Sequence, residues 1–273
     1  MWKRQGIPLV LTVVVCAALI GILGVEIVIL NQFTATDISL TINWVDILVG
    51  LTIYLKTSID FAIYIGHLMG RNVGWKSRVA IEVGTAFGNA AGTMIVLLIW
   101  TFFKEVRWLL ALMILLAALV LFKLAEESLE HAKREDAGFP RWFQRIVNGF
   151  DRGLGTLNKA LMPVLKYVVP NLQVRSGENL SFRPLFILAF SVPFVLGLDD
   201  FAGYVPLFSV INVFGFGIGV FVGHMFLNIL LYLSPERTIQ AVKNPIISFI
   251  GSVAFVGLGV WGLVEVIRLI GGG

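Results

Sequence analysis

Long, nearly uninterrupted runs of apolar residues make up most of the chain. A helix needs about 20 consecutive apolar residues to cross the hydrocarbon core of a bilayer. Closed β-barrels show shorter segments of alternating hydrophobicity instead, about ten residues each. We therefore predict an all-α integral membrane protein. Its seven transmembrane helices are expected near residues 7–31, 45–69, 79–103, 107–123, 183–208, 209–233 and 245–270.

The one long polar segment lies between the fourth and fifth predicted helices, at residues 130–182. Apolar side chains recur there at helical spacing, for example Trp142 and Ile146 among Arg141 and Arg145. A basic amphipathic helix of this kind is typical of a segment that lies on the membrane surface. A solvated linker is the alternative, and both fit a cytoplasmic amphipathic loop.

Composition supports the membrane assignment and excludes other classes. Hydrophobic residues make up 58% of the chain and charged residues 14%, whereas a soluble domain is about 25% charged. The mean hydropathy is +0.89. The single cysteine, Cys16, cannot form an internal disulfide, a redox pair or a thiolate cluster.

The positive charges are distributed unevenly between the two sides of this topology. Lys and Arg cluster before the first helix, between the second and third, in the 130–182 segment, and between the sixth and seventh. Because cytoplasmic loops carry an excess of these residues, we predict a protein of the cell (cytoplasmic) membrane with its N-terminus inside and its C-terminus outside. The net charge of +4 is then a topology signal, and we expect no nucleic-acid partner.

Two parts of the membrane region resemble one another. The pattern Val-Gly-x-x-Phe-x-Asn occurs at 83–89 and 222–228, and Asp-Phe-Ala-x-Tyr occurs at 60–64 and 200–204. The offset is 139 (222 less 83) or 140 (200 less 60). Residues 122–126 and 261–265, also 139 apart, extend the alignment to a third consecutive helix. Since the second copy begins three helices after the first, an odd number, the copies run in opposite directions, as do the inverted repeats of secondary transporters.

This symmetry divides the chain into four parts. They are an N-terminal accessory transmembrane helix at 1–36, a first transmembrane repeat at 45–129, the loop at 130–182 and a second repeat at 183–270. Glycines recur every four residues in the second helix of each repeat and predict close helix packing. They are Gly84, Gly88, Gly92, Gly215, Gly219 and Gly223.

Polar residues at corresponding positions of the repeats are the candidate ligands. An ionised carboxylate in hydrocarbon is costly unless paired, and it marks a functional site by default. Spacings of four or seven residues place several of these groups on one helix face. The expected metal or substrate ligands are Asp60, Asp200, Asn89, Asn228, Asp199, Glu82, His224 and His67. Pro193 and Pro206 flank the second acidic segment and favour a broken or closely packed helix there.

Carboxylate, carboxamide and imidazole groups together suit Mn²⁺, Zn²⁺, Cd²⁺ or Ca²⁺. Protons can occupy the same carboxylates once the ion leaves, so proton-coupled exchange is one option. Structural roles stay open as alternatives. Asp60 could pair with Lys56, Glu82 with Arg78, and the asparagines could join helices by hydrogen bonds.

These segments resemble the LysE transporter superfamily, most closely its cadmium-resistance transporters. An early helix of that family carries Ala-Thr/Ser-x-x-Asp, similar to residues 57–60, and a later one carries Asp-Asn-x-x-x-x-Val-Pro-x-Phe, similar to 199–208. A terminal Ile-x-x-Gly-Leu-Gly pattern resembles residues 255–259. The resemblance implies two inverted three-helix repeats and export of a divalent cation. The chain departs from the family in its first helix, in its longer loop and at Asp200, where the family tends to have Asn.

We therefore expect a secondary transporter, not an enzyme, that exports a divalent metal cation of the Cd, Zn, Mn or Ca class. The ion is the substrate, no cofactor is expected, and the other partner is the lipid bilayer; homo-oligomer formation stays open. The alternatives are an amino-acid exporter of the same fold, an intramembrane aspartyl protease with Asp60 and Asp200 as its dyad, and a membrane scaffold. A large apolar cavity would favour the amino-acid exporter, and a small acidic one the metal exporter.

Overall fold

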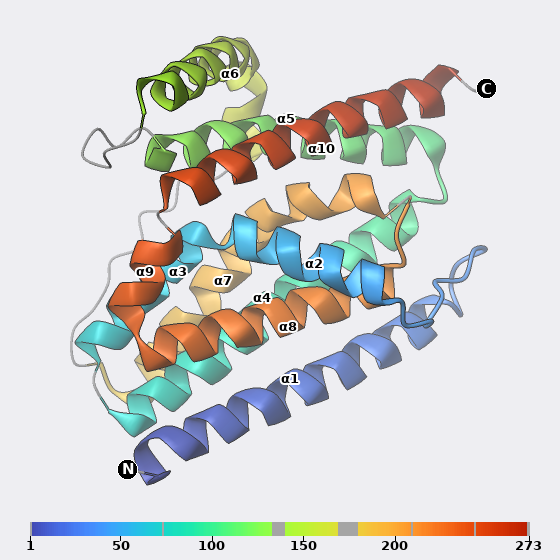
Figure 1. Ribbon diagram of the computed structural model, residues 1–273. Helices are drawn as coiled ribbons and strands as arrows, with labels where there is room; N and C mark the ends of the chain where they lie inside the picture. The colour runs from blue at the N-terminus through green and yellow to red at the C-terminus, as the bar shows by residue number, and fades with distance from the viewer. Residues whose placement is uncertain are drawn as a thin grey trace. The chain divides into compact units, whose positions relative to one another are not determined.

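The computed structural model describes residues 2–72, 74–132, 140–168, 180–208, 210–242 and 244–271. Within its helices, the side chains of 2–5, 59–60, 130–132, 162, 164–168, 195–203 and 242 lie outside this description. The described residues form ten α-helices and one 3₁₀ turn, without a strand (Figure 1). The elements are α1 (Trp2–Leu30), α2 (Trp44–Thr57), α3 (Ile59–Arg71), α4 (Trp75–Phe103), α5 (Arg107–Ala132), α6 (Arg141–Val168), α7 (Phe182–Tyr204), η2 (Val205–Leu207), α8 (Val213–Leu233), α9 (Pro235–Val242) and α10 (Pro245–Gly271).

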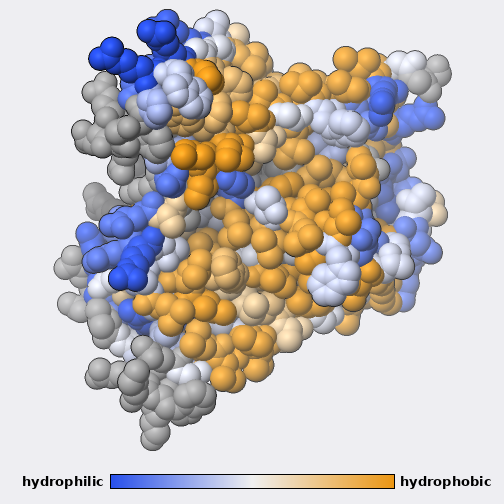
Figure 2. All heavy atoms as spheres, in the orientation of Figure 1, coloured by the Kyte–Doolittle hydropathy of each residue, from blue (hydrophilic) through white to orange (hydrophobic). Residues whose placement is uncertain are grey.

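The helices are long and apolar enough to embed the protein in a membrane. Among the described residues, five of them qualify as spans by themselves, namely α1, α4, α5, α8 and α10, and the bent pair of α2 and α3 can add a sixth. α7 contributes a shorter apolar stretch at Phe182–Phe194. Hydrophobic side chains cover much of the face seen in Figure 2, and hydrophilic ones gather toward its margins. An all-α, membrane-embedded protein is thus confirmed.

Asparagine and proline residues define several helix ends. The side chain of Asn43 accepts a hydrogen bond from the backbone N–H of Val45 at 3.1 Å and caps α2. Asn212 caps α8 in the same way, through the N–H of Gly215 at 3.0 Å. α8 therefore begins at Val213, four residues later than predicted from hydropathy. Proline starts both α9 and α10, a position where its missing N–H costs nothing.

Four elements differ from the prediction. The expected helix at 45–69 is two helices, α2 and α3, which meet at Ser58 with a bend of 67°. Of the two prolines that flank the second acidic segment, Pro193 lies inside α7 without ending it, whereas Pro206 lies in the η2 turn, where the α-helix has ended at Tyr204. α5 extends to Ala132, well past the predicted end at 123. The short helix α9 was not predicted.

The chain forms two compact units. The first contains α1 to α4, α8 and α7 as far as Phe201, and the second contains α5, α6, η2 and α10. In the first unit, a Cβ added at Gly219 or Gly88 would collide with a backbone carbonyl oxygen of α2 or α7, respectively. A Cβ at Gly84 would come within 2.8 Å of the Phe186 oxygen. The close packing predicted from the glycine spacing is confirmed at these positions.

The second unit is built on the antiparallel pair of α5 and α10. The Ser128 hydroxyl donates to the Ser248 carbonyl oxygen at 2.9 Å, and Ser252 donates to the Ala125 carbonyl oxygen at 2.6 Å. Hydrogen bonds of this type join helices where lipid offers no competing donor. They connect the C-terminal end of α5 to the N-terminal end of α10.

Candidate functional site

A pocket opens between the central parts of α1, α4 and α8, all within the first unit. Asn89 is the central residue of α4, and His224 is one residue from the centre of α8. Its cavity has a volume of about 20 Å³, which is room for about one water molecule or ion. The lining residues are Thr12, Val15, Cys16, Leu19, Glu82, Val83, Ala86, Asn89, Phe221, His224, Met225 and Asn228.

α4 contributes a carboxylate and a carboxamide to this pocket. Glu82 and Asn89 are two helical turns apart on one face, and their exposed fractions are 3% and 4%. The Thr12 hydroxyl of α1 donates a hydrogen bond to Glu82 Oε2. Among the described side chains, Glu82 Oε1 and Asn89 Nδ2 are buried without a hydrogen-bond partner. Such atoms are expensive in an apolar surrounding, so each needs a physical explanation.

α8 contributes a hydrogen-bonded imidazole and carboxamide. His224 Nδ1 lies 2.6 Å from the Tyr54 hydroxyl, and His224 Nε2 lies 2.9 Å from Asn228 Nδ2. Asn228 Nδ2 also donates to Thr85 Oγ1 on α4 at 3.0 Å. With the amide oriented in this way, the Asn228 N–H donates a hydrogen bond to Nε2. The neutral ring therefore carries its hydrogen on Nδ1 and donates it to the Tyr54 hydroxyl oxygen.

These hydrogen bonds determine which atoms of His224 and Asn228 can contact a ligand. Both ring nitrogens of His224 are engaged, so the imidazole positions Asn228 and is not a free ligand. Asn228 Oδ1, in contrast, is buried without a hydrogen-bond partner among the residues described. Together with Glu82 Oε1 it gives the pocket two buried oxygen acceptors from two helices. Oxygen atoms of this kind are suited to cations such as Ca²⁺ and Mn²⁺.

The break between α2 and α3 lies against the same histidine. The Phe61 ring packs on the imidazole of His224 with a centroid distance of 5.3 Å, and the Tyr54 ring meets it edge-on at 5.6 Å. These two contacts come from either side of the break at Ser58. Asp60 directly precedes Phe61 in the chain, and its side chain is outside the described residues.

The structure thus brings four of the predicted site residues together. Glu82, Asn89, His224 and Asn228 line one pocket. His67 does not join them, because its side chain is exposed. It follows Asp60 by seven residues and was expected on the same functional face.

The three aspartates of the predicted site, Asp60, Asp199 and Asp200, have side chains outside the described residues. Within the described part of the chain, no group of three His, Cys, Asp or Glu side chains is placed to hold a metal ion. The metal-binding prediction therefore stays a prediction.

Three polar residues of the site were not predicted from the sequence. Thr85 could have been found, since it continues the helical spacing from Glu82 to Asn89. Thr12 could not, because it lies in the first helix, which has no counterpart in the repeat. Tyr54 precedes the duplicated Asp-Phe-Ala-x-Tyr pattern and is not part of it. It is also 170 residues from His224, so no helical spacing could have related the two.

The fold and the pocket together define an all-α membrane-embedded protein with a polar site between apolar helices. Comparison of the chain with protein-family models, with curated proteins and with solved structures finds no match. The site itself is therefore the basis for a functional proposal.

Proposed function

We propose that this protein is a secondary transporter that exports a divalent metal cation through a polar site near the middle of the membrane. The observation that carries the proposal is the cluster of Glu82, Asn89, His224 and Asn228, buried between apolar helices with polar atoms left unpaired. An unsatisfied buried polar atom costs about 1–3 kcal/mol. Ionisable residues inside membrane spans mark substrate and ion pathways by default.

The donor atoms favour particular ions within the expected class. Glu82 Oε1 and Asn228 Oδ1 are oxygens, and the nitrogens of His224 are already engaged. Oxygen ligands suit Ca²⁺ and Mn²⁺ better than the softer Cd²⁺ and Zn²⁺. In this proposal Asp60 and Asp200 supply further carboxylates, with Asp199 as a third.

The inverted repeat is part of the proposal and is supported by how helices pair. The glycines of α4 contact α7, and those of α8 contact α2, so the second helix of each proposed repeat packs on the first helix of the other. The third helices, α5 and α10, pack on one another in antiparallel fashion. Exchange of partners in this manner is what a two-fold axis in the membrane plane requires.

The pocket also has a property that favours the amino-acid exporter. Much of its wall is apolar, including Leu19, Phe221 and Met225. A small organic cation could place an ammonium group at Glu82 and an apolar part against these side chains. This second candidate has the same fold and the same polar residues.

Transport into proteoliposomes tests both candidates. Purified protein would be reconstituted around a metal-sensitive dye, and influx of Mn²⁺, Ca²⁺, Cd²⁺ and Zn²⁺ would be measured. We expect Asp60→Asn, Asp200→Asn and Glu82→Gln to reduce influx to the level of empty liposomes, and His67→Ala to retain it. Unchanged influx in both aspartate variants would refute the proposal. Influx of radiolabelled amino acids that depends on Glu82, with no metal influx, would establish the second candidate.

The orientation belongs to the same proposal. The distribution of Lys and Arg favours a cytoplasmic N-terminus and an outside C-terminus in the cell membrane. Single cysteines would be introduced in the Cys16→Ser background. A cysteine at Gly74 should react with a membrane-impermeant thiol reagent only from inside, and a cysteine at Glu105 only from outside.

A further inference from the structure

α6 has three distinct faces, and one of them packs on the protein. Phe143, Val147, Leu154 and Asn158 are buried and follow one another at spacings of four, seven and four residues, which place them on one face of the helix. Phe143 and Phe150 meet the Phe249 ring of α10 with centroid distances of 5.4 and 6.1 Å. The helix is therefore held on α5 and α10 by an apolar face of its own.

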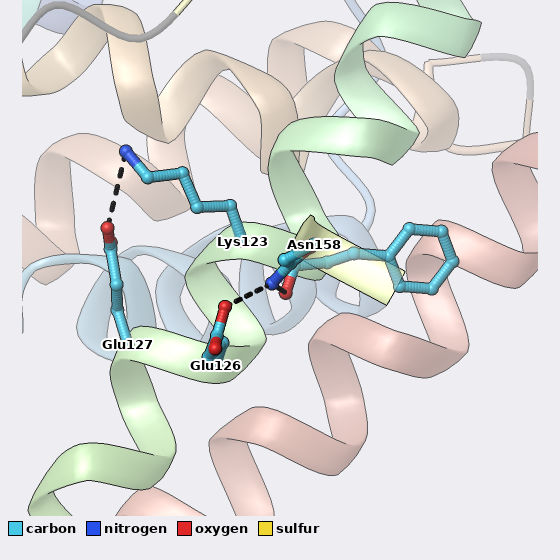
Figure 3. Close-up of polar contacts among 5 residues, drawn as sticks. Lys123, Glu126, Glu127 and Asn158 are labelled. Atoms are coloured by element: carbon cyan, nitrogen blue, oxygen red, sulfur yellow. Dashed lines mark hydrogen bonds and ion pairs between the residues drawn. The ribbon is translucent and has the colours of Figure 1, made fainter. Parts of the chain in front are cut away.

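Polar contacts fix the position of α6 along α5 (Figure 3). The Asn158 amide donates to Glu126 Oε2 at 2.6 Å and to the Phe122 carbonyl oxygen at 3.1 Å. Lys123 and Glu127 form an ion pair on the same turns of α5, at 3.3 Å. These residues lie near the end of the apolar stretch Arg107–Leu129. α6 therefore lies at the level where a spanning helix leaves the hydrocarbon core.

A second face of α6 is apolar and exposed. Trp142, Ile146 and Leu157 have exposed fractions of 63%, 50% and 39%. At 100° per residue, these side chains and the exposed Gly149 and Gly153 fall within about 80° of one another around the helix. The centre of this stripe is roughly 100° from the centre of the buried face, so the same helix cannot bury both against α5 and α10.

The third face carries the cations of the helix. Arg141, Arg145, Arg152 and Lys159 are all exposed and fall within about 40° of one another, at roughly 100° from the exposed apolar stripe. The helix has a single acidic residue, Asp151, which lies away from this basic stripe. The cations therefore form a continuous positive edge beside the apolar stripe.

We propose that α6 binds the anionic headgroup surface of the bilayer. Trp142, Ile146 and Leu157 enter the boundary between headgroups and acyl chains, where Trp is favoured. The basic stripe contacts the phosphates of anionic lipids, and its long side chains extend to the headgroup level. A lipid surface fits better than a protein partner because the helix is already fixed at the membrane-boundary end of α5. This inference is independent of the transported substrate.

A fluorescent label tests the orientation of the helix. In the full-length Cys16→Ser chain, NBD would be attached to Cys at position 146 (Ile146→Cys) and, as the matched control, to Cys at position 148 (Asn148→Cys), on an exposed polar side. Nanodiscs of phosphatidylcholine with and without phosphatidylglycerol would carry nitroxide-labelled lipids as quenchers. We expect quenching at 146 to exceed quenching at 148, and to increase with phosphatidylglycerol.

The basic stripe provides the second arm of the test. Replacing Arg145 and Arg152 by Gln should lower the ratio of bound to unbound helix about fivefold for each cation removed, which corresponds to roughly 1 kcal/mol per Arg. High salt should act in the same direction. Equal quenching at the two positions, or quenching at 146 that is indifferent to phosphatidylglycerol, would overturn the proposal. The latter result would be expected if a protein partner covered this face.

A second measurement applies if the Cys16→Ser chain does not fold. In the natural chain, brominated lipid quenches the fluorescence of the tryptophans that it contacts. The part of this quenching that disappears in Trp142→Phe reports the contact of Trp142 with lipid. We expect a larger loss in phosphatidylglycerol nanodiscs than in phosphatidylcholine alone. No difference between the two lipids would contradict the assignment.

Discussion

Gly219→Ala places a methyl group where α8 and α2 are in backbone contact. The new Cβ would collide with the Ile47 carbonyl oxygen and would lie 2.8 Å from the Leu51 nitrogen. Ordinary contacts begin near 3.4 Å, so α2 must retreat by more than half an ångström. The neighbouring atoms are backbone and cannot rotate away. The two helices must therefore separate along the whole contact.

The cost of that separation can be bounded. A gap of 0.5–1 Å forfeits about a quarter to a half of the dispersion energy of the atoms on either side, and overpacking of this kind costs roughly 1–3 kcal/mol. At roughly 2–4 °C per kcal/mol for a chain of this size, the melting temperature should fall by about 2–12 °C. The Tyr54–His224 hydrogen bond spans the same interface and should lengthen with it.

The buried thiol of Cys16 supplies the assay, because it is the only cysteine of the chain. A thiol-reactive dye in detergent solution reports its exposure as the protein unfolds on heating. Gly257→Ala is the matched control, since no atom lies within 4 Å of a Cβ added there. It should leave the melting temperature unchanged or raise it. Equal melting temperatures for Gly219→Ala and the control would refute the packing argument.

Three further predictions concern single polar contacts. Thr12→Val removes the donor to Glu82 and should lower stability by about 1–3 kcal/mol in the same dye assay, whereas Thr12→Ser should retain it; equal effects would contradict the contact. Tyr54→Phe should also cost about 1–3 kcal/mol, because it leaves the His224 Nδ1–H buried without an acceptor, and a stability unchanged from the natural protein would argue against this tautomer. Asn158→Leu removes a hydrogen bond to a carboxylate, worth about 1.5–3 kcal/mol, so trypsin should cleave α6 roughly tenfold faster or more; unaltered cleavage would show that the apolar face alone holds the helix.

Hydropathy predicted most of the helices because membrane thickness fixes their length. It failed at Ser58, where α2 ends and α3 begins. No glycine or proline lies between Ile53 and Ala62, so local sequence offers no reason for a break. The contacts of Tyr54 and Phe61 with the His224 ring come from the opposite sides of the break. We infer that tertiary packing, which a single sequence does not reveal, stabilises the bend.

The candidate site was predicted in part for a similar reason. Polar residues at helical spacing in α4 and α8 are rare enough in apolar helices to be noticed, and Glu82, Asn89, His224 and Asn228 do line one pocket. Thr12 could not be identified, because threonine is common in apolar helices, where its hydroxyl bonds to the preceding turn. Here the Thr12 oxygen lies 3.0 Å from the Pro8 carbonyl oxygen and also within hydrogen-bond distance of Glu82, so its single hydrogen is shared between the two acceptors.

The hydrogen bonds of the pocket connect helices that the proposed repeats separate. Tyr54 joins α2 to α8 through His224, and Asn228 joins α8 to α4 through Thr85. In alternating access, one repeat moves against the other around the substrate site. Such a movement must break these bonds or carry α2, α4 and α8 together as one body. Because the glycine contact between α2 and α8 leaves no room for sliding without repacking, the second course costs less.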